Sequence, residues 1–199
     1  MSAKSTRTPM PRLATLEDLL ALPEAERFHE VLDGVLVPKE LAGPQHGLGQ
    51  GNVRGWLNPF HRRPNGPSRP GGWWILTEVT IEFALHQVER PDVAGWRRER
   101  MPQVSTSLPL RLRPDWVCEV LTDSDGRRRD GLQKRRIYAD HGVPHYWLLD
   151  MERQVLTVLR LTGRGYVEVV EAGRTERVRA EPFEALELAV GELFGDDAD

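Results

Sequence analysis

The segment Trp116–Leu121, which reads WVCEVL, constrains the fold most because it is an apolar run that contains a single charged residue, Glu119. A short run of this kind is typical of a central strand that is buried on both faces of a sheet. An ionised carboxylate in such a strand costs several kcal/mol unless a cation or a hydrogen-bond donor compensates it. We therefore expect Glu119 to be protonated, to form a buried ion pair, or to help hold a metal cation.

The rest of the chain predicts alternating strands and helices. Thr15 and Asp18 have the spacing of a capping box at the start of a short helix, and Asp33-Gly34 is a favourable hairpin turn. Helices are predicted over 46–60 and 127–141, with a short one near 188–194. Strands are predicted over 73–87, 88–96, 145–150, 154–161 and 166–173, the last two as a hairpin. This order predicts an α/β or α+β sandwich around one sheet.

Length and composition set outer limits. A chain of 199 residues can form one domain with a substantial core, and we expect a flexible tail over 1–14, the domain over 15–195 and an acidic tail over 196–199. The net charge of −3 means that any nucleic-acid binding must use local basic patches. The single cysteine, Cys118, excludes a disulfide framework and a cysteine-based zinc site, and we expect a buried thiol. No apolar stretch approaches the ~20 residues of a membrane helix, and the N-terminus lacks the apolar core of a secretory signal, so we expect a cytoplasmic protein.

Asp115 and Glu119 stand four residues apart on one face of the central strand. At a rise of ~3.3 Å per residue they lie ~13 Å apart, whereas the ligands of Mg²⁺ lie ~2.1 Å from the ion. The two carboxylates therefore cannot share one ion. Asp115 is expected to be a strand-entry residue that follows Pro114.

Asp92 is the better partner for Glu119. It also follows a proline and stands 27 positions earlier, a separation that fits strand, connection, strand, so the two strands could be neighbours ~4.8 Å apart. The alternative is an ordinary Pro-Asp turn. Lys134, the one lysine among five arginines in 127–136, could stabilise the negative charge that develops during phosphodiester hydrolysis. Its alternative is a solvated helix face.

Further residues remain open at this level. His46 and Glu78 could face the site. Two groups of arginines could contact phosphates, or could simply be solvated: Arg127, Arg128 and Arg129, and Arg97, Arg98 and Arg100. The tryptophans are expected mainly in the core, with base stacking as the alternative for Trp73, Trp74 and Trp96.

Several segments, in order and with matching gaps from about residue 15 to 195, resemble the Uma-two family of restriction endonucleases in the PD-(D/E)XK nuclease superfamily. They are FHEVLDGVLV, His46, ERPDVAGW, RPDWVCEVLTDS and YADHGVPHYWLLD. The resemblance implies a restriction-endonuclease-like fold, with a central mixed sheet flanked by helices and an N-terminal β-hairpin.

The resemblance also implies roles. Asp92 would be the motif aspartate, Glu119 the motif glutamate, and Glu30 an acidic residue that extends the cluster. The usual lysine position of the superfamily falls on Leu121, and the lysine role looks transferred to Lys134.

These observations predict an endonuclease that hydrolyses DNA phosphodiesters with Mg²⁺ or Mn²⁺. Asp92 and Glu119 would bind the ion, and the backbone carbonyl of Val120 is a plausible third ligand. A homodimer is plausible because cutting both strands favours two sites. Two alternatives stay open: a non-catalytic DNA-binding or protein-interaction module on the same scaffold, and a metal-dependent hydrolase of a small phosphorylated substrate. The first is favoured by the acidic net charge and by TDSDG (122–126), where relatives tend to read Ser-Pro-Ser-Thr; Asp123 and Asp125 could weaken phosphate approach or add outer metal contacts.

Overall fold

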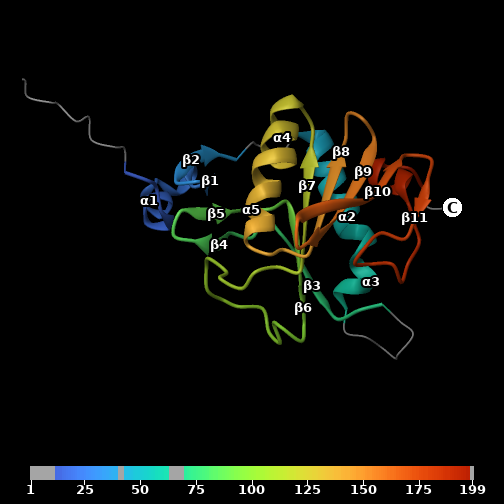
Figure 1. The fold of residues 1–199 in the computed structure, drawn as a ribbon, viewed down its shortest axis with the longest axis horizontal. Coiled ribbons are helices and arrows are strands. Elements are labelled where there is room, and N and C mark those ends of the chain that lie inside the picture. Colours follow the sequence, from blue (N-terminus) through green and yellow to red (C-terminus); the bar gives the residue numbers. More distant parts are fainter. Residues whose placement is uncertain (1–11, 40–42, 63–69, 198–199) are drawn as a thin grey trace, which may run out of the picture.

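A computed structural model describes residues 12–39, 43–62 and 70–197. Its main sheet has six strands in the order β10-β9-β8-β7-β6-β3 (Figure 1). The β7–β8 pair is parallel and the other pairs are antiparallel, so the sheet is mixed, as predicted. The strands are β3 Trp73–Thr77, β6 Val93–Arg97, β7 Trp116–Leu121, β8 His145–Asp150, β9 Val155–Thr162 and β10 Gly165–Gly173.

A second, four-stranded sheet has the order β2-β1-β5-β4 and contains the predicted hairpin. Asp33 and Gly34 both have left-handed φ angles, 52° and 75°, which the tight turn between two antiparallel strands requires. The four strands are β1 His29–Leu32, β2 Val35–Pro38, β4 Ile81–Ala84 and β5 Gln87–Glu89. A short pair, β11 Arg177–Val178 and β12 Leu188–Ala189, completes the strands of the described residues.

The prediction of one sheet is wrong, because two predicted strands pass from one sheet to the other. The segment 73–87 breaks at Glu78, whose φ of 54° is left-handed, and its halves are β3 and β4. The segment 88–96 breaks around Pro91, and its halves are β5 and β6. Both breaks bring polar side chains to the junction between the sheets, where the candidate site lies.

Helices cover both faces of the main sheet (Figure 1). The predicted helix 46–60 is divided into α2 and α3. The predicted helix 127–141 is divided into α4, a π-helical segment and α5, and it is followed by Gly142, whose φ is 71°. The helices are α1 Leu16–Ala21, α2 Pro44–Trp56, α3 Asn58–His61, α4 Ser124–Arg128, the π segment Arg129–Lys134, α5 Arg135–Asp140, and 3₁₀ turns at Glu24–Glu26 and Val190–Phe194. At the start of α1 the Thr15 N–H donates to Asp18, as the capping-box spacing predicts.

The alternation along β7 divides the core into two layers. Trp116, Cys118 and Val120 pack in one cluster with side chains of α2 and α3, whereas Val117 packs in another with Tyr138 of α5. The buried Cys118 thiol and the burial of Trp73 and Trp96 agree with the prediction that these residues belong to the core. Glu119 points to the α5 side, which decides where its partners come from.

Both predicted tails fall largely outside the description, since residues 1–11 and 198–199 are not described. Within the described tail, Asp196 pairs with Arg174. In the described parts of the chain no helix has both the length and the apolarity that crossing a bilayer requires.

Candidate functional site

Asp92 and Glu119 lie side by side at one end of the main sheet. The antiparallel register pairs Val93 of β6 with Cys118 of β7, so Asp92, directly before β6, faces Glu119. The Asp92 N–H lies 3.3 Å from Glu119 Oε2, and the Val120 N–H donates to Asp92 Oδ2 at 2.7 Å. Both carboxyl groups are buried. The structure therefore brings together the two residues that sequence spacing paired.

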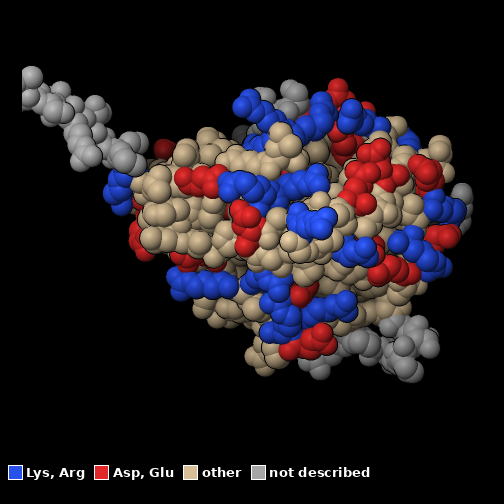
Figure 2. All heavy atoms as spheres, in the orientation of Figure 1, with Lys and Arg blue, Asp and Glu red and all other residues tan. Residues whose placement is uncertain are grey.

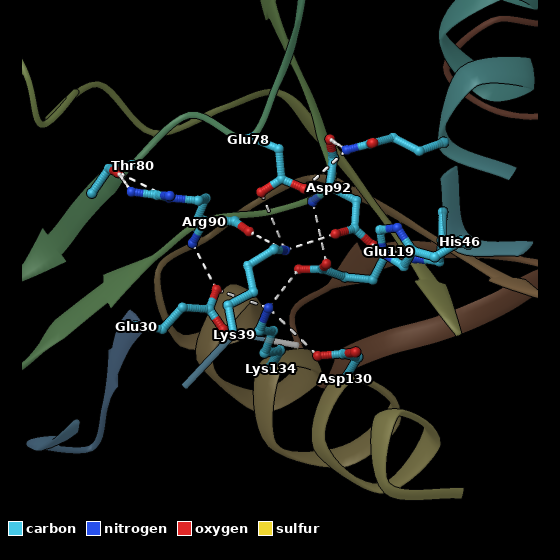
Figure 3. Close-up of polar contacts among 12 residues, drawn as sticks. Glu30, Lys39, His46, Glu78, Thr80, Arg90, Asp92, Glu119, Asp130 and Lys134 are labelled. Atoms are coloured by element: carbon cyan, nitrogen blue, oxygen red, sulfur yellow. Dashed lines mark hydrogen bonds and ion pairs between the residues drawn. The ribbon is translucent and has the colours of Figure 1, made fainter. Parts of the chain in front are cut away.

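Lys134 reaches Glu119 from the other side. Its Nζ lies 2.9 Å from Glu30 Oε1, 3.1 Å from Glu119 Oε1 and 3.5 Å from Asp130 Oδ1, and its side chain is 1% exposed (Figure 3). The hydroxyl of Tyr138 donates to Glu119 Oε1 at 2.7 Å. The alternative reading of Lys134 as part of a solvated helix face is wrong. The π segment that carries Lys134 is also a local irregularity of a kind that occurs often at functional sites.

Helix α2 supplies the second side of the site. His46 Nε2 lies 3.0 Å from Asp92 Oδ2, and Gln50 Nε2 donates to the Asp92 carbonyl at 2.9 Å and to Glu78 Oε1 at 3.0 Å. The helix can come this close because Gly49 faces β7. A Cβ at Gly49 would lie 2.6 Å from Met151 Sδ and 2.9 Å from a methyl carbon of Val120.

Glu78 occupies the break between β3 and β4. A left-handed φ at a residue other than glycine is uncommon, and such residues cluster at functional sites. The Glu78 N–H lies 3.3 Å from the Asp92 carbonyl. His46 and Glu78, which the sequence left open, therefore both belong to the surroundings of Asp92.

Lys39, directly after β2, was missed by the sequence analysis. Its Nζ donates to Asp92 Oδ1 and to the Arg90 carbonyl, each at 2.7 Å, and lies 3.6 Å from Glu78 Oε2 (Figure 3). Nothing in the local sequence marks it, because a lysine at the end of a hairpin strand is usually solvated. Asp130 could have been noticed from its i, i+4 spacing to Lys134.

Buried acidic groups outnumber buried ammonium groups here. Among the described residues, Lys39 and Lys134 face five buried carboxyl groups, and Arg129 reaches one of them, Asp130, from the surface. The five are Glu30, Glu89, Asp92, Glu119 and Asp130. Oε2 of Glu30 and both carboxyl oxygens of Glu89 are buried and have no hydrogen-bond partner in the described residues. Buried oxygens without donors are costly, and a bound cation is one way to compensate them.

The pKa values of the buried acidic groups are shifted in opposite directions. Burial raises the pKa of Glu119 to about 8, and the nearby Asp92 charge adds to this, although Lys134 opposes it. Burial alone would also raise the pKa of Asp92, but Lys39 and His46 hold it well below its ordinary value. Burial, with Glu30 nearby, raises the pKa of Glu89 well above its usual range, which favours its neutral form. Acid groups with pKa values pushed apart in one place are typical of functional sites.

The donor set fits a hard divalent cation. Among the described residues no three His, Cys, Asp or Glu side chains already form a group that could hold a metal ion. Mg²⁺, however, usually binds through one or two carboxylates and keeps several waters. Asp92 and Glu119 are the residues that would hold such an ion.

A narrow polar pocket opens onto these groups. Its lining includes Lys39, Asp92, Glu119 and Lys134, together with Thr122 and Gly126 of the TDSDG segment. Asp123 of that segment accepts the Gly126 N–H at 2.7 Å and so caps α4. The side chain of Asp125 lies outside the described part of the chain.

Asp115 lies at the opposite end of β6 and β7, together with Arg97, Arg98 and Arg100. Asp115 accepts the Arg97 N–H at 2.8 Å and an Arg100 N–H at 2.5 Å, so it is the strand-entry residue that we expected. Arg98 lies with its guanidinium carbon 3.4 Å from the centroid of the Trp74 ring. These side chains stabilise that end of the sheet.

The fold and the site together define a restriction-endonuclease-like protein: a mixed sheet flanked by helices, with neighbouring strands that bring buried carboxylates next to a lysine. The profile of the Uma2 family, described as "Putative restriction endonuclease", matches residues 16–191, so the chain belongs to this family.

The solved structures support the fold. The chain is similar to a protein from Anabaena variabilis whose crystal structure is described as "a putative nuclease belonging to DUF820". The TM-score is 0.70 at 22% identity, over 90% of this chain and 97% of the other. No curated protein matches the chain.

Proposed function

We propose that this protein is an endonuclease that hydrolyses phosphodiester bonds in DNA with the help of Mg²⁺ or Mn²⁺. The observation that carries the proposal is the buried pair Asp92–Glu119 on neighbouring strands, with the Lys134 ammonium 3.1 Å from Glu119. The family description and the restriction-endonuclease-like fold support it.

Each residue has a distinct task in this proposal. Asp92 and Glu119 hold the cation, with the Val120 carbonyl as a third ligand. Tyr138 and Lys134 both hold Oε1 of Glu119, so Oε2 is the atom directed to Asp92. When bound, the ion would polarise the phosphoryl oxygen and lower the pKa of a coordinated water.

Lys134 supplies a fixed positive charge beside the reacting phosphate, where negative charge develops. Glu30 holds the Lys134 ammonium in place from the second sheet, at 2.9 Å. Because Lys134 has carboxylates on three sides, its position is set by the cluster and not by solvent.

The surface beside the site favours a nucleic-acid substrate. Arg128, Arg129 and Arg136 line a groove along the π segment and α5, and Arg129 also lines the polar pocket. Figure 2 shows basic side chains gathered near α4 and α5, with acidic ones to the right of them. Arginines in such a groove can hold the backbone of a strand whose scissile phosphate enters the pocket. The pocket is too narrow to enclose a whole small substrate.

A plasmid assay tests the proposal. With Mg²⁺, supercoiled DNA should become nicked or linear, and EDTA should stop the reaction. Asp92→Ala and Glu119→Gln should remove cleavage, while Arg111→Met, a change at an exposed side chain paired with Glu82, should not. Full cleavage by Asp92→Ala would refute the assignment. DNA binding without metal-dependent cleavage would instead support a non-catalytic module.

The same assay bears on the homodimer that we propose for cutting both strands. If two copies of the protein cooperate, linear product should form early. At low protein concentration its initial rate of formation should be proportional to the square of that concentration. A single copy should give nicked circles first.

A further inference from the structure

Lys39 holds Asp92 from the side opposite Val120 and His46. It donates to Asp92 Oδ1 at 2.7 Å, and its side chain is 7% exposed (Figure 3). Lys134 forms ion pairs with Glu30, Glu119 and Asp130 and none with Asp92. The two buried lysines therefore neutralise different carboxylates, and Lys39 alone of the two pairs with Asp92.

Both oxygens of Asp92 are already engaged by groups of the chain. Oδ2 accepts the Val120 N–H at 2.7 Å and lies 3.0 Å from His46 Nε2, and Oδ1 accepts from Lys39. Val120 lies within β7, so its N–H cannot withdraw without disturbing the strand. The Lys39 ammonium, at the end of a side chain with four methylene groups, is the group that can withdraw most easily.

A metal ion bound at Asp92 Oδ1 would also repel the Lys39 ammonium. Two positive charges within a few ångströms of each other in a buried site repel strongly, because little solvent screens them. An ammonium and a metal ion would therefore exclude each other at this oxygen. The remaining contacts of Lys39, the Arg90 carbonyl and Glu78, give the displaced ammonium partners nearby.

We propose that Lys39 is an internal competitor for the divalent cation: the ion gains Asp92 Oδ1 only when the Lys39 ammonium leaves it. This inference rests on the proposed function, since it assumes a cation at Asp92. It assigns Lys39 a positioning role that sets the metal concentration at which the site loads. Removing the ammonium should therefore tighten metal binding, the opposite of what the loss of a ligand or of a purely structural residue would do.

The test measures Mn²⁺ affinity by the electron paramagnetic resonance signal of free Mn²⁺, without DNA. Lys39→Met should lower the Kd at least tenfold relative to the wild type. Arg111→Met also removes one positive charge, but from an exposed side chain that pairs with Glu82, and should change the Kd less than twofold. An unchanged or raised Kd for Lys39→Met would overturn the inference.

Loss of Lys39 leaves a buried Asp92 charge without its ammonium, so folding must be measured in parallel. Saturating Mn²⁺ should raise the Tm of Lys39→Met more than that of the wild type, because tighter binding stabilises the folded state more. Lys39→Gln, which keeps an N–H donor without charge, should behave in the same way. If saturating Mn²⁺ raises the Tm of neither variant more than it raises that of the wild type, the inference is wrong.

Asp92→Asn separates the two proposals. If Asp92→Asn abolishes Mn²⁺ binding while Lys39→Met has the wild-type affinity, the competitor role of Lys39 is refuted, whereas the proposed metal site at Asp92 is supported. If Asp92→Asn binds Mn²⁺ as well as the wild type, the cation is not at Asp92, and both proposals fail.

Discussion

The chain contains the tripeptide Arg-Pro-Asp twice, at 90–92 and at 113–115, and each copy enters a strand of the main sheet. Because β6 and β7 are antiparallel neighbours, the two aspartates lie at opposite ends of the sheet. Asp115 meets one guanidinium and one backbone N–H, which satisfy it. Asp92 meets the Lys39 ammonium and the His46 imidazole inside a cluster with a surplus of carboxyl groups. The same local motif therefore serves two purposes, and the distant segments packed on it decide which.

The comparison separates a closed ion pair from an open acidic cluster. At Asp115 the charges balance, and removing one partner should affect stability alone. At Asp92 buried oxygens of Glu30 and Glu89 lack donors in the described residues, and Glu78 holds a left-handed backbone. Such uncompensated features are retained where they serve function.

The largest expected effect is the contrast in activity between the two aspartates. Asp92→Asn should lower metal-dependent DNA cleavage by about a thousandfold, because a lost cation ligand removes several kcal/mol of transition-state stabilisation. Asp115→Asn should retain cleavage within roughly threefold when rates are corrected for the folded fraction. Equal losses in both variants would erase the functional distinction between the two copies.

Lys134→Gln should give the next largest effect. The loss of its charge should lower the single-turnover cleavage rate by roughly a hundredfold, while the Mn²⁺ affinity stays within a few-fold of the wild type. Rapid-quench kinetics and a Mn²⁺ titration measure the two quantities separately. A parallel fall in both would mean that Lys134 organises the metal site and does not act on the phosphate.

Asp115→Asn should lower the free energy of unfolding by about 1–2 kcal/mol, since it weakens charge-assisted hydrogen bonds to Arg97 and Arg100. Urea denaturation measures the change. Added Mn²⁺ should stabilise this variant as much as it stabilises the wild type. If Mn²⁺ did not stabilise Asp115→Asn, the cation would lie at the Asp115 end of the sheet, which would contradict the proposed site at Asp92.

The smallest effect concerns the surplus carboxyl group Glu89. The native state holds the proton of Glu89 to a higher pH than the unfolded chain, which releases it near the ordinary pKa of 4.5, so the stability of the wild type falls as the pH rises above that value. Glu89→Gln has no such loss, so its free energy of unfolding relative to that of the wild type should rise by about 1–2 kcal/mol between pH 5 and pH 8. Urea denaturation at the two pH values measures it. If the difference in the free energy of unfolding between Glu89→Gln and the wild type were the same at both pH values, Glu89 would already be ionised in the native state at pH 5.

Much of this architecture follows from local patterns. The buried strand around Glu119, the Asp33-Gly34 hairpin and the helix that carries Lys134 were predictable from apolar runs, turn residues and spacing. The pairing of Asp92 with Glu119 also followed, because strand geometry excluded Asp115 as the partner. Family resemblance, and not local pattern, pointed to Glu30.

The remainder depends on contacts that no local pattern contains. Lys39 stands 53 positions before Asp92, and only the arrangement of two sheets brings them together. The sequence predicted continuous strands through Glu78 and Pro91 because apolar alternation persists on both sides of each break. The burial of Lys134 was also hidden, since a lysine among arginines usually lies in solvent.

A crystal soaked in Mn²⁺ tests the central claim most directly. The account predicts one anomalous peak within about 2.5 Å of carboxylate oxygens of both Asp92 and Glu119, with Lys39 Nζ moved away from Asp92 Oδ1. Ordered Asp92 and Glu119 side chains at saturating Mn²⁺, with no anomalous peak between them, would contradict it.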